Sequence, residues 1–207
     1  MSPVQVSPLQ AVAERIIARY LKRGFSSDVQ IVSGFEMFAS RGMDITYTAS
    51  DGNRRAIKLK ADPYFGTDSS KIGDRRLPFY RADTGSLAFE AVSNSATKEP
   101  GWMISSGADE LYYYYLAIAQ EEAEVSALLQ ERDEVFFSEI LVERDDLIVL
   151  PFAETRAWFT AKADKYATRP VFTGAIASWD RLVARSDVQR QVKGARIVGP
   201  VFPGLAL

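Results

Sequence analysis

The stretch Met43–Asp62 carries an acid and two lysines whose spacing could bring them together. Two runs of alternating side chains flank Asp51–Gly52, and Asp-Gly is a strong short-range signal for a tight hairpin. On the first run Asp44 shares a strand face with two threonines, and on the second Lys58 and Lys60 share a face. An acid at the start of one strand and a lysine pair late on its partner are therefore predicted to meet.

The composition restricts the groups that could carry out chemistry. The chain has 207 residues, of which 47% are hydrophobic and 25% charged, and its formal net charge is −2. A polyanion would therefore have to bind to a local patch rather than to a global basic field. The chain contains no cysteine and no histidine, which excludes disulfides, thiolate and zinc-hydrolase sites, and His-based acid–base catalysis. Carboxylates, lysine, arginine, tyrosine and hydroxyl groups remain.

The length suits one well-buried domain. Residues 1–207 are predicted to form it, with residues 1–8, which include two prolines, lying loose. The N-terminus lacks the charged and then apolar pattern of a signal peptide, and no apolar run reaches about 18 residues. We therefore expect a cytoplasmic protein without a membrane partner.

The hairpin is expected to lie among further helices and strands. Helical spacing of apolar residues predicts an amphipathic helix from Leu9 to Leu21 with a stop at Gly24. Its Glu14 is interpreted as a solvated charge, with a metal-adjacent carboxylate as the alternative. The other predicted elements are strands at Val29–Val32, Ser86–Ser93, Glu110–Leu116, Val135–Val142 and Leu147–Leu150, a turn at Arg144–Asp146, a helix at Phe152–Lys165 and a short helix in the segment leading to Asp187.

Two of these strands carry side chains with alternative roles. Glu90 lies on an otherwise apolar face of its strand, and burial of a lone carboxylate is costly unless a cation or a metal compensates it. The alternative is a surface glutamate on an edge strand. The four consecutive tyrosines 112–115 could stack on bases, but packing in the core is favoured because aromatic residues dominate cores.

A basic region follows the turn of the hairpin. Residues 51–81 contain eight basic and four acidic side chains, a local excess of +4. The region is either a solvated loop or a rim that contacts phosphates. The candidates for such contacts are Arg54, Arg55, Lys58, Arg75 and Arg76.

The order of these elements resembles the restriction-endonuclease-like fold of the PD-(D/E)xK nuclease superfamily. The resemblance spans about residues 9–120 and extends to the segment GSLAFEAVS…GWMISSGADELYYYYL. It implies an α/β fold with a central mixed β-sheet flanked by helices. It also implies that Asp44 corresponds to the first aspartate of the family and Lys60 to its lysine, which orients or activates the attacking water. The acids of the family bind Mg²⁺, with Mn²⁺ as the alternative, and oxygen ligands suit this metal.

One position departs from the family pattern. The middle acid of the motif falls on Lys58, and a lysine there would repel Mg²⁺. Either Glu90 or Asp62 supplies the missing ligand, or the site is inactive. The first hypothesis is therefore a divergent Mg²⁺-dependent nuclease acting on DNA, in which Asp44 and Glu90 hold the metal.

Two further hypotheses stay open. In the second, the chain is a catalytically inactive nuclease-like scaffold that binds nucleic acid or a protein partner through Lys58 and Lys60. In the third, it is an interaction protein that forms a homodimer or larger oligomer through its aromatic strands. Fold resemblance alone does not decide between them.

Overall fold

The computed structural model describes residues 6–24, 26, 28–65, 81–82, 86–173 and 176–203. The amphipathic helix predicted near the N-terminus is present as α1 (Pro8–Gly24), which buries its apolar stripe. The elements that follow are β1 (Val29–Ile31), α2 (Glu36–Ala39), β2 (Ile45–Thr48), β3 (Arg54–Asp62), β4 (Tyr64–Phe65), β5 (Arg81–Ala82), β6 (Ser86–Asn94), β7 (Glu99–Pro100), α3 (Trp102–Ser105), β8 (Glu110–Ile118), α4 (Glu122–Leu128), α5 (Asp133–Glu139), β9 (Val142–Pro151), α6 (Phe152–Lys162), a 3₁₀ turn (Ala163–Lys165), β10 (Ala167–Thr173), β11 (Ile176–Ala184), α7 (Arg185–Gln191) and β12 (Arg196–Gly199).

The central element is a six-stranded sheet in the order β1-β2-β3-β8-β9-β12. Its β3–β8 pair is parallel and its other pairs are antiparallel, so the sheet is mixed. The hairpin predicted around Asp51–Gly52 is confirmed as β2 and β3, and Gly52 has the positive φ of 79° that such a turn favours. A second, antiparallel sheet has the order β10-β11-β6-β7, and β4 pairs with β5.

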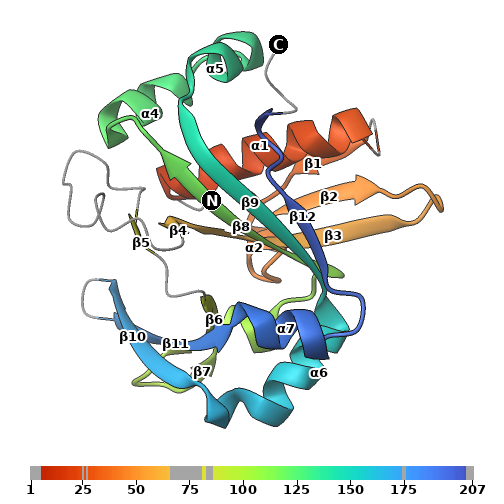
Figure 1. Ribbon diagram of the computed structural model, residues 1–207, viewed down its shortest axis with the longest axis vertical. Coiled ribbons are helices and arrows are strands. Elements are labelled where there is room, and N and C mark those ends of the chain that lie inside the picture. Colours follow the sequence, from red (N-terminus) through yellow and green to blue (C-terminus); the bar gives the residue numbers. More distant parts are fainter. Residues whose placement is uncertain are drawn as a thin grey trace.

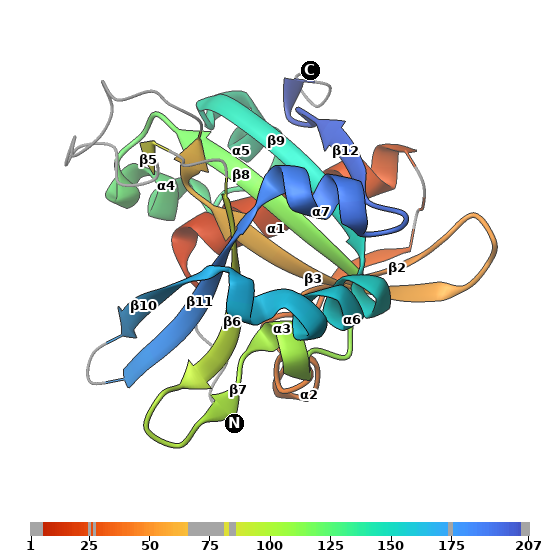
Figure 2. The ribbon, with the colours of Figure 1, turned by 60° about the horizontal axis from the view of Figure 1, so that its bottom comes forward.

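Helices and the second sheet cover the two faces of the six-stranded sheet (Figure 1). On one face α1, α4 and α5 contribute side chains to a first core, and on the other α3, α6, α7 and the sheet containing β6 contribute to a second (Figure 2). The prediction of a mixed sheet flanked by helices is therefore confirmed. No helix in the described part of the chain is long and apolar enough to cross a membrane.

The four consecutive tyrosines of β8 connect the two cores. Tyr112 and Tyr114 point into the core beside α1, whereas Tyr113 and Tyr115 point into the other. Each is at most 3% exposed, as expected when successive residues of a central strand alternate between two covered faces. These rings pack and are not accessible to nucleic-acid bases.

Part of the prediction for the second half of the chain is wrong. Residues 135–142 were expected to be a strand, but most of them lie in α5, where Phe136 and Ile140 bury side chains one helical turn apart. The turn expected at Arg144–Asp146 lies inside β9. Asp145 resembles a turn residue in sequence, but its carboxylate accepts hydrogen bonds from the Tyr114 hydroxyl (2.9 Å) and from the Val201 N–H (2.7 Å).

The short helix expected in the segment leading to Asp187 is also wrong, because most of that segment is β11. This strand lies between β10 and β6, and Val183 is fully buried in the second core. Its partner β6 is therefore an inner strand and not an edge strand. Glu90 on β6 consequently lies opposite Asp180 on β11.

Candidate functional site

The strand β3 extends beyond the end of its hairpin partner. The pairing of β2 with β3 runs from Thr48 opposite Arg54 to Ile45 opposite Ile57, while β3 continues to Asp62. Side chains complete the open edge that remains. The Leu59 N–H donates to Asp44 Oδ2 (2.7 Å). Gln10 Nε2 donates to the Leu59 carbonyl (3.0 Å), and Gln10 Oε1 accepts from the Ala61 N–H (3.2 Å). The Gln10 amide thus occupies the place of a neighbouring strand.

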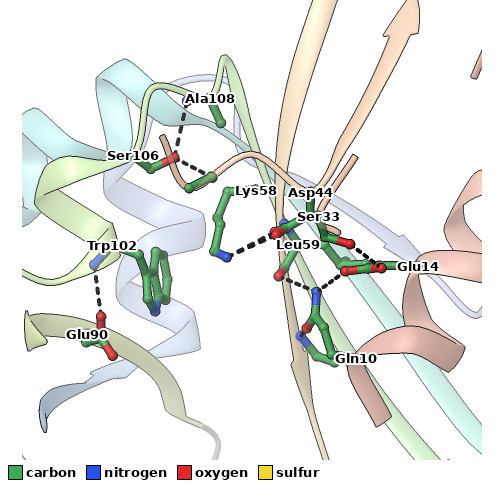
Figure 3. A network of polar contacts seen from close by, with 12 residues as sticks. Gln10, Glu14, Ser33, Asp44, Lys58, Leu59, Glu90, Trp102, Ser106 and Ala108 are labelled. Carbon is green, nitrogen blue, oxygen red and sulfur yellow. Dashed lines mark hydrogen bonds and ion pairs between the residues drawn. The ribbon is translucent and has the colours of Figure 1, made fainter. Parts of the chain in front are cut away.

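A cavity of about 390 Å³ opens beside this edge. Asp44, Lys60 and Glu90, the residues predicted to form the catalytic set, all line it, together with Lys58. In Figure 3, Asp44 and Glu14 lie on one side of Lys58, and Glu90 and Trp102 lie on the other. The structure therefore brings an acid and two lysines of the hairpin together with an acid of a later strand.

Lys58 forms an ion pair with Asp44 across the hairpin. Its ammonium lies 3.0 Å from Asp44 Oδ2 and 3.3 Å from Oδ1. The Asp44 side chain is 10% exposed and that of Lys58 18% exposed, so solvent screens this pair less than a surface pair. Both oxygens of Asp44 are consequently engaged, because Oδ2 also accepts the Leu59 N–H.

A third acid, Glu14 of α1, lines the same cavity. It is only 3% exposed, so its interpretation as a solvated charge is wrong. Ser33 Oγ donates to Glu14 Oε2 (2.7 Å) and Gln10 Nε2 donates to Oε1 (3.2 Å). Burial raises the pKa of Glu14 to about 7; the two hydrogen bonds oppose this shift, the charge of Asp44 adds to it, and Lys58 opposes it.

The sequence contains one signal for this burial. Glu14 lies four residues after Gln10 and three before Ile17, on the stripe of α1 that faces the sheet. An acid on an apolar stripe was therefore visible, but the side chains that hold it come from Ser33, beyond β1, and from Gln10, which also bonds to β3. Neither contact has a local sequence signature.

Glu90 is positioned by the segment that leads into α3. The Trp102 N–H donates to Glu90 Oε1 (3.0 Å). Partial burial raises the pKa of Glu90 above its usual value; the Trp102 hydrogen bond opposes this shift, Asp180 adds to it, and both Lys60 and Lys58 oppose it. A β-carbon at Gly101 would lie 2.8 Å from Glu90 Cγ and closer still to the Glu90 carbonyl. The absence of a side chain at Gly101 thus permits this close approach.

Lys60 differs from Lys58 in its partners. Within the described ranges, no carboxylate oxygen lies within 4.0 Å of the Lys60 ammonium, the longest distance for an ion pair. Its charge nevertheless lowers the pKa values of Asp62 and Glu90, which burial raises. The cavity therefore holds one lysine that is neutralised by Asp44 and one that is not.

The predicted basic rim is only partly assembled at this cavity. Arg54 pairs with Asp28 (2.8 Å) and Arg55 with Asp51 (2.9 Å). Both arginines line a different hollow, near the start of β8. Arg75 and Arg76 lie outside the described residues.

The predicted Mg²⁺ does not fit this arrangement of side chains. The Lys58 ammonium lies against the carboxylate of Asp44, in the place where a metal ion held by Asp44 would have to bind. Moreover, the described residues contain no group of three or more acids close enough to hold a metal ion, and Mg²⁺ requires near-octahedral oxygen coordination. With Lys58 in this position the described residues do not form a Mg²⁺ site, and magnesium as a cofactor stays a prediction that nothing here tests.

Comparisons with known proteins add no relative. Neither a protein-family model, nor a curated protein, nor a solved structure matches the chain. The arguments about function consequently depend on the geometry of the cavity.

The buried acid on α1 makes the stability of the protein depend on pH. The pKa of Glu14 is about 7 in the folded chain and 4.5 in the unfolded chain. Between these values the folded chain binds more protons, so the free energy of unfolding falls as the pH rises. We expect Glu14→Gln to remove this decline, because glutamine cannot ionise. The free energy of unfolding of the variant should exceed that of the wild type by about 3 kcal/mol at pH 8 but by little below pH 5.

Urea unfolding at several pH values measures this effect. Glu36→Gln is the matched control, because Glu36 is an exposed residue of α2 and does not line the cavity. A difference between Glu14→Gln and the wild type that stays constant from pH 5 to pH 8 would contradict the assignment.

The close approach of Gly101 to β6 predicts a large effect of one methyl group. Gly101→Ala should lower the free energy of unfolding by about 1–3 kcal/mol, because the β-carbon would push against the Glu90 backbone. Gly34→Ala is the control, since a β-carbon there would meet no atom within 4 Å. Equal urea midpoints for the two variants would show that β6 and the segment before α3 are not in this contact.

Proposed function

We propose that the chain is a nuclease-like scaffold that binds nucleic acid, with a backbone phosphate held in the cavity by Lys60 and Lys58. The observation that carries the proposal is the ammonium of Lys60, which forms no ion pair within the described residues and lies in a cavity whose other lysine is paired with Asp44. A phosphate oxygen supplies the missing counter-charge, and lysine is a common phosphate contact.

The acids of the cavity do not oppose this binding as strongly as their number suggests. Asp44 is neutralised by Lys58. Glu14, with a pKa of about 7, is largely protonated below neutral pH, and the pKa of Glu90 is raised as well. The local charge is therefore more positive than a count of side chains implies. The proposal is also based on the resemblance of the order of elements in the sequence to that of the nuclease superfamily.

Removal of the unpaired lysine tests the proposal directly. Lys60→Ala should weaken binding of labelled single-stranded and double-stranded DNA about three- to tenfold and reduce the salt slope by about one counterion. Fluorescence anisotropy at several salt concentrations measures both quantities. Lys165→Ala is the control, because Lys165 is exposed and does not line the cavity. Equal affinities of the two variants would refute phosphate binding at Lys60.

The second candidate is a phosphodiester hydrolase. It is favoured by the convergence of Asp44, Lys60 and Glu90, the residues that the resemblance assigns to catalysis, on one cavity. In that function Lys58 would have to leave Asp44, since the ion pair occupies both carboxylate oxygens. The two candidates therefore differ in what Asp44 does.

Asp44→Asn separates them. The asparagine can still accept the Leu59 N–H, but it no longer neutralises Lys58. For a binding scaffold we expect DNA affinity to rise several-fold, because a second ammonium becomes available to phosphate. For a hydrolase we expect cleavage of plasmid DNA in Mg²⁺ or Mn²⁺ by the wild type and its loss in the variant. Unchanged affinity together with intact plasmid in both proteins would contradict both functions.

A further inference from the structure

A second hollow lies on the face of the six-stranded sheet that α1 covers. It has a volume of about 180 Å³ and shares no lining residue with the first cavity. Tyr47 and Tyr112, which are 6% and 3% exposed, form its buried part together with Glu110, and Tyr20 of α1 lies beside them. Arg55 and Arg196 complete the charged part of the lining.

The carboxylate of Glu110 has unused hydrogen-bonding capacity. Its Oε2 accepts the Tyr47 hydroxyl (2.7 Å). Its Oε1 forms ion pairs with the guanidinium groups of Arg55 and Arg196 at 3.7 and 3.8 Å, and these distances are too long for hydrogen bonds. The Glu110 side chain is 10% exposed, and buried carboxylates normally accept several hydrogen bonds. Glu110 Oε1, which borders the hollow, can therefore accept a further hydrogen bond.

The guanidinium of Arg196 has the complementary feature. Its side chain is 58% exposed and lines the hollow, and within the described residues it donates no hydrogen bond, although it forms the long ion pair with Glu110. Arg55, in contrast, is already bound to Asp51 at 2.9 Å. The hollow thus combines tyrosine rings, one carboxylate oxygen that can accept a hydrogen bond, and one guanidinium that can bind an anion.

We propose that this hollow binds a small ligand consisting of one planar ring with a hydrogen-bond donor and an anionic group. The ring packs against Tyr47 and Tyr112, the donor bonds to Glu110 Oε1, and the carboxylate or phosphate binds Arg196. The volume suits one ring and a small substituent, since an apolar cavity of about 150 Å³ holds benzene. Two rings would exceed it.

Calorimetric titration with small probes tests the site. 4-Hydroxybenzoate carries the ring, the donor and a carboxylate, and 4-hydroxyphenyl phosphate carries the same ring and donor with a phosphate. We expect at least one of them to bind with a dissociation constant below about 1 mM, and Arg196→Ala to weaken it about tenfold or more. Saturable binding of only one probe identifies a carboxylate or a phosphate as the anionic group.

The remaining variants assign the other contacts. Benzoate, which lacks the hydroxyl donor, should bind more weakly than 4-hydroxybenzoate to the wild type, and Glu110→Gln should reduce this difference. Ala49→Phe should block binding by filling the hollow, whereas Lys193→Ala, at an exposed position outside its lining, should not change it.

Three results would overturn the inference. The first is that neither probe binds saturably. The second is that Arg196→Ala and Ala49→Phe leave binding unchanged in folded protein. The third is that Lys60→Ala abolishes binding, because this result would place the ligand in the first cavity. Circular dichroism establishes that each variant is folded. Because Arg196 does not line the first cavity, its replacement should leave DNA affinity unaltered, so this test is independent of the proposed function.

Discussion

The open edge of β3 is the constraint from which the candidate site arises. Where β2 ends, the strand would expose backbone N–H and C=O groups in a part of the protein that is largely buried, and such groups require partners. The carboxylate of Asp44 and the amide of Gln10 supply them at Leu59 and Ala61. Polar side chains are therefore held at this point for structural reasons, whatever ligand the cavity binds.

This requirement also explains why charges accumulate there. Once Asp44 is fixed by a backbone hydrogen bond, its negative charge needs a cation, and Lys58 lies beside it across the hairpin. Burial of Glu14, and to a smaller extent the negative charge of Asp44 beside it, raises its pKa to about 7. The charge state of the cavity follows from the edge of one strand, and Lys60 is the lysine of this network that forms no ion pair within the described residues.

The sequence was sufficient to predict those parts of the site that depend on local signals. The hairpin around Gly52 and the shared face of Lys58 and Lys60 follow from turn chemistry and from the two-residue period of a strand. The role of Glu90 could be predicted only as an alternative, because whether β6 is an edge or an inner strand depends on its pairing with β11, a strand from near the end of the chain. Pairing between distant strands has no local signature.

The errors in the second half of the chain have a similar origin. Residues 135–142 and the segment containing Leu182 each combine apolar and aromatic residues over a short run, and such runs fit a strand or a buried helix equally well. In the structure the first run is helical because Phe136 and Ile140 both reach the core beside α1, and the second is extended because its two faces meet different partners. Tertiary packing decides whether such a run forms a helix or a strand, and the periodicity of a few residues does not reveal that packing.

The alternation of side chains along β3 separates the cavity that Lys58 and Lys60 line from the hollow that Arg55 and Tyr47 line. Lys58 and Lys60 point to the side of Glu90, whereas Arg55 is on the opposite face of the strand with Tyr47 and Glu110. A basic segment that appears in the sequence as one cluster is therefore divided between two environments. In one, a lysine lies among acids whose pKa values burial raises; in the other, an arginine lies beside tyrosine rings and the carboxylate of Glu110. A compact ammonium and a planar guanidinium recognise anions differently. The strand geometry therefore favours two separate ligands, one at the lysines and one at the arginine, over a single polyanion that contacts both.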